Sequence, residues 1–361
     1  MARELFIHVG VSKTGTSSLQ YAMRESAAAL SDAGVGIVFP RRGTRTTQLL
    51  RPLGWEPGTG FPRPVDGSAL DATMMSLRRT PGDRLLLTVE DLAELDEKRI
   101  GALVDRVELH TKLRPHVIVT VRDWSRQLPS DWQQQLKRRL TTDYETWLAQ
   151  VRDGVGEQAR GFRTRQDVAG VCARWATRVP PERIHVLPVA APGQDHDTIF
   201  RDVADVVGFD HALVTRPSRP VNPSYGLLEC EVLRRLNLAL GDRLTELGSE
   251  YNPAVRRPLA AGVLDRWGEK RVTLPPAHLG WVREEMRRQV RELRALGVQE
   301  QTDLDLLVPG EDAARPLPEI SEAEISASAI EALAGFAAWT FEHRRNRARQ
   351  RAAEHPAGDQ R

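Results

Sequence analysis

The chain has 361 residues, which is enough for two domains or one large domain with a sizeable core. Its 51 Lys and Arg against 49 Asp and Glu leave a net charge of +2, so no overall basic field points to nucleic acid. No run approaches the ~18 apolar residues of a membrane span. The first strand begins too early for a signal peptide, so we expect a soluble, cytoplasmic protein.

Short runs rich in Val, Ile and Leu alternate with helical patterns along the first two thirds of the chain. The runs predict buried strands at residues 5–10, 36–40, 84–90, 116–121 and 183–189. Helical patterns cover residues 17–30, 94–113 and 168–179. Because the runs are nearly continuous, they favour a parallel sheet covered on both faces. The sequence therefore predicts an α/β fold with a central parallel sheet flanked by helices.

The sequence pattern changes at about residue 222, where long amphipathic helices are predicted to begin. These are predicted at residues 227–240, 281–296 and 325–345. We expect an α/β core at 1–221, a helical extension packed on it at 222–354, and a disordered tail at 355–361. Residues 41–68, rich in Gly, Pro and Arg, are expected to form a long loop. Cys172 and Cys230 match no metal spacing and are expected to be reduced core thiols, and no metal site is predicted.

A predicted strand, a glycine-containing loop and a helix follow one another near the N-terminus. Gly10 and Gly15 have the spacing of a Walker A loop, but the lysine is displaced to Lys13 and Thr16 occupies its usual position. Amide groups at a helix N-terminus bind phosphate, and Thr16 and Ser17 add hydroxyl donors. Lys13 would reach the group that bridges a bound phosphate and whatever is transferred from it. The alternative is an ordinary strand-to-helix turn with a solvated lysine.

The segment Ser12-Lys13-Thr14-Gly15-Thr16-Ser17 resembles the 5′-phosphosulfate loop of sulfotransferases that use 3′-phosphoadenosine-5′-phosphosulfate (PAPS). The family form is Pro-Lys-(Ser/Thr)-Gly-Thr-(Ser/Thr). Ser12 replaces the proline, which removes a restraint on φ but no ligand group. The resemblance implies a P-loop-type α/β fold like that of nucleotide hydrolases. It also implies PAPS as donor, held at its 5′-phosphate by these six residues, without a required metal.

A second polar pair follows the predicted fourth strand. Arg122 ends that strand, and Ser130 lies eight residues later, at the start of a predicted helical run. A guanidinium, a hydroxyl and helix N-terminal amides can surround one phosphate. The spacing resembles the 3′-phosphate site of the same family. Ser130 and Gln133 also fit a capping box, and the two roles of Ser130 are compatible.

Glu90 ends the predicted third strand, so it would meet Lys13 and Arg122 at the carboxyl edge of the sheet. In carbohydrate-type sulfotransferases a Glu often deprotonates the acceptor hydroxyl, and Glu90 resembles it in position. The resemblance therefore implies that Glu90 is the general base and that Lys13 stabilises the leaving phosphate. Alternatively, Glu90 or Asp91 caps the following helix. His8, inside the first strand, is expected to be a core or pocket-wall residue.

Arg219 and Asn222 lie in a polar, proline-rich stretch at residues 215–226. This stretch resembles the late family loop that closes over the adenosine and 3′-phosphate of the donor. Asn222 could instead cap the helix predicted to start at residue 227.

Together these features predict transfer of a sulfuryl group from PAPS to a hydroxyl or amine of a small-molecule or carbohydrate acceptor. A glycoside, a glycolipid or a secondary metabolite fits the aromatic and basic residues expected near the acceptor, namely Arg42, Arg45, Trp55, Tyr144 and Trp147. One alternative is a P-loop NTPase or kinase, which Thr16 weakens and for which only Glu90 and Asp91 could hold Mg²⁺. The other is a nucleotide-binding protein without catalysis. The sequence predicts no nucleic-acid partner and leaves the oligomeric state open.

Overall fold

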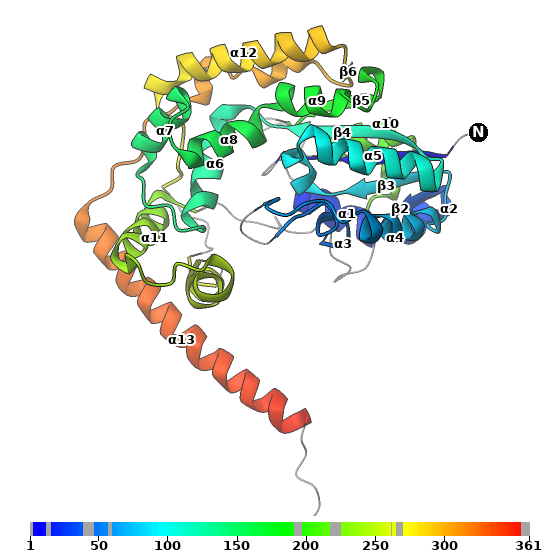
Figure 1. The fold of residues 1–361 in the computed structure, drawn as a ribbon. Coiled ribbons are helices and arrows are strands. Elements are labelled where there is room, and N and C mark those ends of the chain that lie inside the picture. The colour runs from blue at the N-terminus through cyan, green and yellow to red at the C-terminus, as the bar shows by residue number, and fades with distance from the viewer. Residues whose placement is uncertain are drawn as a thin grey trace, which may run out of the picture. The chain divides into compact units, whose positions relative to one another are not determined.

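The protein is described by a computed structural model that covers residues 3–11, 16–38, 47–56, 60–190, 197–216, 225–260, 262–264 and 270–354. Within these residues six strands form one sheet in the order β2-β3-β1-β4-β5-β6, and every pairing is parallel (Figure 1). The strands are β1 (Glu4–His8), β2 (Val35–Ile37), β3 (Arg84–Thr88), β4 (Arg114–Val121), β5 (Ile184–Pro188) and β6 (Gln299–Glu300). This confirms the predicted parallel sheet flanked by helices, with a helical C-terminal region.

The sheet is buried on both faces, as its continuous apolar runs require. One set of alternate residues, which includes Phe6, Leu86 and Ile118, packs with Leu19 and Met23 of α1 (Thr16–Glu25). The same core takes in α2 (Ala27–Asp32) and α10 (Thr198–Val207). On the other face, α5 (Glu97–Thr111) and α9 (Val168–Ala176) contact β4.

The remaining helices differ from the expected pattern in ways that have local causes. The single helix expected at 17–30 is divided at Ser26, whose Oγ accepts a hydrogen bond from the Thr215 amide at 2.7 Å. The expected loop at 41–68 contains α3 (Thr47–Leu50), and α4 begins at Gly67. The two residues of β6 are too few to give a strand pattern. The other helices are α4 (Gly67–Arg78), α6 (Trp124–Leu136), α7 (Tyr144–Asp153), α8 (Glu157–Gln166), α11 (Leu227–Leu240), α12 (Leu279–Leu296) and α13 (Glu322–Glu354).

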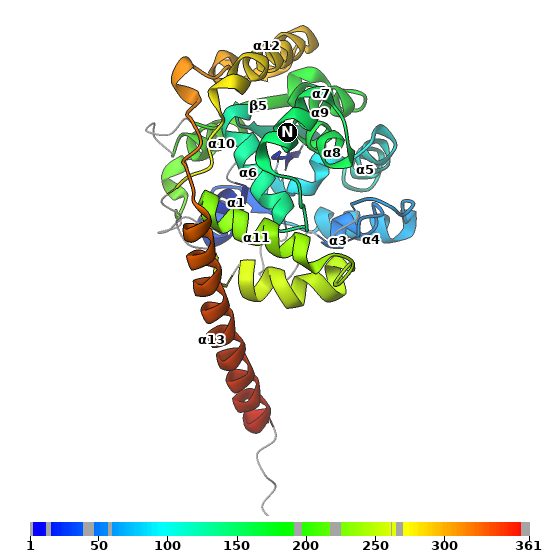
Figure 2. The ribbon, with the colours of Figure 1, turned by 90° about the vertical axis from the view of Figure 1, so that its left-hand side faces the viewer.

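The chain divides into two compact units. Unit 1 comprises Met1–Asp131, Leu148–Val221 and Leu274–Arg315 and contains the sheet. Unit 2 comprises Trp132–Trp147, Asn222–Thr273 and Pro316–Arg361 and contains α11, a π-helical segment (Leu247–Ala260) and α13. Within unit 2, α13 lies beside α11 in both views (Figure 2), and Arg235 of α11 binds Glu322 of α13 at 2.6 Å.

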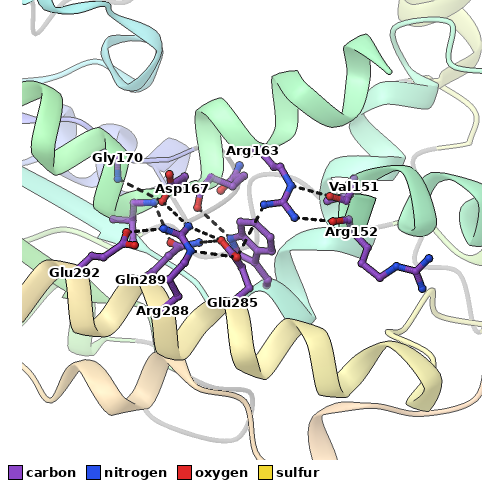
Figure 3. Close-up of polar contacts among 12 residues, drawn as sticks. Val151, Arg152, Arg163, Asp167, Gly170, Glu285, Arg288, Gln289 and Glu292 are labelled. Carbon is purple, nitrogen blue, oxygen red and sulfur yellow. Dashed lines mark hydrogen bonds and ion pairs between the residues drawn. The ribbon is translucent and has the colours of Figure 1, made fainter. Parts of the chain in front are cut away.

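In unit 1, an ion-pair network attaches α12 to the start of α9 (Figure 3). Arg288 of α12 binds Glu285 at 2.6 Å and Asp167 at 3.3 Å. Asp167 caps α9 through the Gly170 amide, and the buried Gln289 Oε1 accepts from the Val168 amide at 3.0 Å. A C-terminal helix is thereby fixed to a helix that packs on the sheet.

Two histidines lie side by side near the amino ends of β4 and β5. His116 Nδ1 is 3.2 Å from His185 Nε2, and Gln301 lies 3.3 Å beyond His185. Burial and the positive charge of Arg183 lower the pKa of His116 to about 4. Burial and the neighbouring His116 lower the pKa of His185 to about 4. Both rings are therefore neutral at pH 7, and one donates to the other.

We expect the folded state to lose stability as pH falls from about 6.5 through 4. Because the folded pKa of each ring lies below its unfolded value, the unfolded chain binds the extra protons in this window. Each ring then contributes a loss of up to about 1.4 kcal/mol per pH unit. Urea unfolding of wild type and His185→Gln at several pH values measures this, and the variant should show the shallower slope. His211→Gln, at a partly exposed position away from this pair, is the control, and equal slopes in all three proteins would contradict the prediction.

Candidate functional site

The strand order reverses between β1 and β4. The chain leaves β1 toward β2 on one side of the sheet, and it leaves β4 toward β5 on the other. In open parallel sheets, ligands bind outside the carboxyl ends of the strands at such a reversal. A ligand site is therefore expected at this edge of unit 1.

The strand register sets which residues lie level with one another at this edge. His8 pairs with Thr88 of β3 and with Ile118 of β4. The β4 pairing continues past β1, because the Val11 amide donates to the Thr120 carbonyl at 3.3 Å. Extended by two residues, the register with β4 puts Gly10 level with Thr120, on a strand about 4.8 Å away, while Glu90 comes two residues after the end of β3. Glu90 and Arg122 thus follow the two strands that flank β1.

Gly10 passes very close to polar side chains of β4 and α1. A Cβ atom on Gly10 would lie 2.6 Å from Thr16 Oγ1, 2.7 Å from Thr120 Oγ1 and 3.0 Å from His8 Nε2. Thr16 is the first residue of α1, and its side chain is buried. The absence of a side chain at Gly10 therefore lets the chain leave β1 directly against the N-terminus of α1.

His8 is a buried neutral residue beneath this edge. Its Nε2 lies 3.0 Å from Thr120 Oγ1, and burial lowers the pKa of His8 to about 4. Its Nδ1, like Thr88 Oγ1 across the strand pair, is buried without a hydrogen-bond partner among the described residues. A ring this far from solvent belongs to the core, which is one of the two places that the sequence predicted for it, and is not an exposed base.

Arg122 follows β4 and folds back over the first turn of α6. Its Nε donates to Gln127 Oε1 at 3.1 Å, and its Nη2 donates to the Arg126 carbonyl at 3.0 Å. Burial and the positive charge of Arg126 lower the pKa of Arg122 to about 10, so it stays charged at pH 7. Its Nη1 has no hydrogen-bond partner among the described residues, which leaves a donor for an anion.

Ser130 does not begin a helix, and the expected capping box with Gln133 is wrong. Helix α6 starts at Trp124, because Asp123 Oδ1 accepts from the Arg126 amide at 3.2 Å as an N-cap residue does. Ser130 is partly exposed in the body of α6. In an α-helix its amide pairs with the Arg126 carbonyl, which is the group that Arg122 contacts. The helix geometry thus keeps Arg122 and Ser130 near one another. The N-terminus of the helix, however, lies beside Arg122 and not at Ser130.

Glu90 opens a 3₁₀ turn, Glu90–Glu94, and is partly exposed. Val89 occupies the N-cap position of that turn, and the next helix, α5, is capped by Asp96. Neither N-cap position is therefore occupied by Glu90 or Asp91. Arg174 of α9 holds the end of this turn by donating to the Ala93 carbonyl at 2.9 Å and the Leu95 carbonyl at 3.1 Å.

Six predicted site residues lie outside the described residues: Ser12, Lys13, Thr14, Gly15, Arg219 and Asn222. Val11 and Thr16, the residues on either side of Ser12 to Gly15, belong to the described part of the chain. Ser17 follows Thr16 in the first turn of α1 and is partly exposed.

Two aromatic residues expected near the acceptor belong to the core of unit 2. Trp147 is 0% and Tyr144 is 4% exposed, and Tyr144 packs against Trp132 with ring centroids 4.9 Å apart. Side chains so enclosed are not available to an acceptor. The helical spacing of Tyr144 and Trp147 among the polar residues of α7 could have indicated that they are buried. Cys172 and Cys230 are buried free thiols, as expected.

Sequence reasoning missed the cluster of Thr16, Thr120 and His8 around Gly10. Thr120 gave no signal by itself, because a threonine inside a β-branched run is ordinary strand composition. The glycine before the loop was a usable signal, since glycine permits close approach of the backbone to its neighbours.

Comparisons with known proteins find a likeness to a solved structure. No family model matches the sequence, and no curated protein matches it significantly. Among solved structures, the chain is similar to a sulfotransferase from Alicyclobacillus acidocaldarius, with 18% sequence identity and a TM-score of 0.41. The match covers 66% of this chain and 94% of the other.

Proposed function

We propose that this protein is a sulfotransferase that moves a sulfuryl group from PAPS to a hydroxyl or amine of a small-molecule or carbohydrate acceptor. One observation carries the proposal. The segment that bears the PAPS-loop motif leaves the sheet from β1, beside β4, where the strand order reverses. Glu90 and Arg122 follow the strands on either side, which supports a site shared with the segment after β1.

The described residues suit an anionic nucleotide as donor. Gly10 leaves no side chain between β1 and the first turn of α1, where amide groups favour a phosphate. Thr16, Ser17 and the segment 12–15 would hold the 5′-phosphate of PAPS. Arg122 and Ser130 would hold its 3′-phosphate, with Arg219 and Asn222 closing over the nucleotide.

The proposed chemistry needs one base and one cation. Glu90 would accept the proton of the acceptor hydroxyl while the acceptor oxygen bonds to sulfur. Lys13 would stabilise the charge that grows on the phosphate oxygen while its bond to sulfur breaks. As in phosphoryl transfer, the protein contributes mainly positioning and electrostatic stabilisation. A sulfuryl group carries a single charge, so we propose that no metal ion is needed.

A transfer assay with donor labelled in its sulfur tests the proposal. The protein is incubated with PAPS and a cell extract, in the presence and absence of excess EDTA, and products are searched by mass spectrometry for a gain of one SO₃. We expect a labelled product in both conditions. Transfer of phosphate from ATP, with complete dependence on a metal ion, would instead assign the site to a kinase.

A further inference from the structure

Helix α13 is apolar on two opposite sides, and unit 2 covers only one of them. On the inner side Ile325 and Ala332 are buried. Gly335 lies so close to Val263 that a Cβ on it would approach the valine Cγ1 to 2.6 Å. Trp339, one turn further, lies against Gly262. These contacts account for the inner side of the helix.

The opposite side presents what we call the outer stripe: Ile330, Leu333, Ala334, Ala337 and Phe341. At 3.6 residues per turn these positions fall within about 60° of Ile330. The three large side chains are 67%, 68% and 66% exposed, in the order Ile330, Leu333 and Phe341. Figure 2 shows the C-terminal half of α13 extending past α11 of the same unit. Three such residues on one stripe differ from the scattered exposed apolar residues of ordinary surfaces.

Positively charged side chains follow the outer stripe toward the C-terminal end of α13. Arg344 and Arg345 are exposed, and their positions lie within about 60° of Ile330 on the helix. The sequence adds Arg347, Arg349 and Arg351. Long arginine side chains beside an exposed apolar stripe can reach lipid headgroups while the apolar side chains lie at the acyl boundary. Anionic headgroups attract such cations.

We propose that the outer stripe of α13 docks on an anionic lipid surface, with its apolar side chains at the acyl boundary and Arg344 and Arg345 at the headgroups. A second copy of the chain is the alternative occupant, and its presence would show in the oligomeric state. A nucleic acid would leave the apolar stripe in water.

The helix would lie on the surface and not cross it. In the part of the chain that the structure describes, no helix is both long enough and apolar enough to span a bilayer. The proposal does not depend on the function proposed above, because the outer stripe lies on α13 and the site residues examined in the structure belong to unit 1.

Vesicle sedimentation with the full chain tests the proposal. We expect binding to vesicles that contain phosphatidylserine, weakened by salt, and little binding to phosphatidylcholine alone. Arg344→Glu/Arg345→Glu should weaken binding about 30-fold or more, because each cation near an anionic surface contributes roughly a factor of five to ten. Leu333→Asp should also weaken it, since it places a charge at the acyl boundary.

Matched controls separate docking from general charge and general hydrophobicity. Arg287→Glu/Arg291→Glu changes two exposed arginines of α12, and Leu109→Asp changes a leucine of α5 that is 64% exposed. Both controls should bind vesicles like wild type. Equal losses in the controls, or no binding to anionic vesicles, would overturn the proposal. So would a dimer in analytical ultracentrifugation that Leu333→Asp dissociates, because a second copy would then cover the stripe.

Discussion

Lys13→Ala should lower sulfuryl transfer by at least about 10²–10³-fold, the loss typical when one group that stabilises developing charge is removed. The motif offers no other cation between Gly10 and Leu19 to replace it at the leaving phosphate. The melting temperature should stay within the error of wild type, since the role proposed for Lys13 lies in transfer and not in folding. The labelled-donor assay measures the first quantity, and thermal unfolding measures the second.

Lys98→Ala is the matched control, because Lys98 is an exposed lysine on α5 outside the proposed site. It should transfer at the wild-type rate. Turnover of Lys13→Ala within threefold of wild type would remove Lys13 from the mechanism.

Glu90→Gln should lower kcat by about 10²-fold or more while donor affinity changes little, as expected when a general base is lost. The substitution keeps the shape of the side chain and removes only its ability to take a proton. A large loss of stability is not expected, because Val89 occupies the N-cap position of the turn and Asp96 caps the following helix. Steady-state kinetics and donor titration separate the two effects.

Asp91→Asn, at the next position of the same turn, is the control for a general effect of lost charge and should keep most of the activity. A fall in melting temperature or in donor affinity with unchanged kcat would give Glu90 a structural role instead.

The sequence was most informative where a single local pattern decides the structure. Continuous apolar runs predicted five of the six strands, and α11 begins and ends at the predicted residues, Leu227 and Leu240. The sixth strand, β6, has two residues and depends on pairing with β5, which no local pattern reveals. The start of α6 was missed because Ser130 and Gln133 imitate a capping box, whereas Asp123 supplies the cap.

The sequence indicated which polar residues follow the central strands, but not what surrounds them. Glu90 and Arg122, expected to end their strands, come shortly after β3 and β4, at the edge that the strand ends of a parallel sheet share. The spacing of Tyr144 and Trp147 along α7 could have indicated burial, but the partners that enclose them, such as Trp132, lie elsewhere in unit 2. The same holds for His8, whose lowered pKa comes from burial by other elements.

The central claim is that this edge binds a nucleotide with a 3′-phosphate, and Arg122 is the described residue that carries it. Arg122 stays charged and offers Nη1, while each hydrogen bond to a charged group contributes about 1.5–3 kcal/mol net. Arg122→Ala should therefore weaken binding of adenosine 3′,5′-bisphosphate and leave binding of adenosine 5′-monophosphate nearly unchanged. Arg114→Ala, at the exposed opposite end of β4, is the control and should change neither.

Calorimetry of the wild-type protein with both nucleotides is the most direct measurement. The bisphosphate should bind at least ~100-fold more tightly than the monophosphate, because about 2.7 kcal/mol corresponds to two decades in Kd. Arg122→Ala should remove most of that difference. Equal affinities for the two nucleotides in the wild-type protein, or a preference for ATP, would contradict the assignment of a PAPS site.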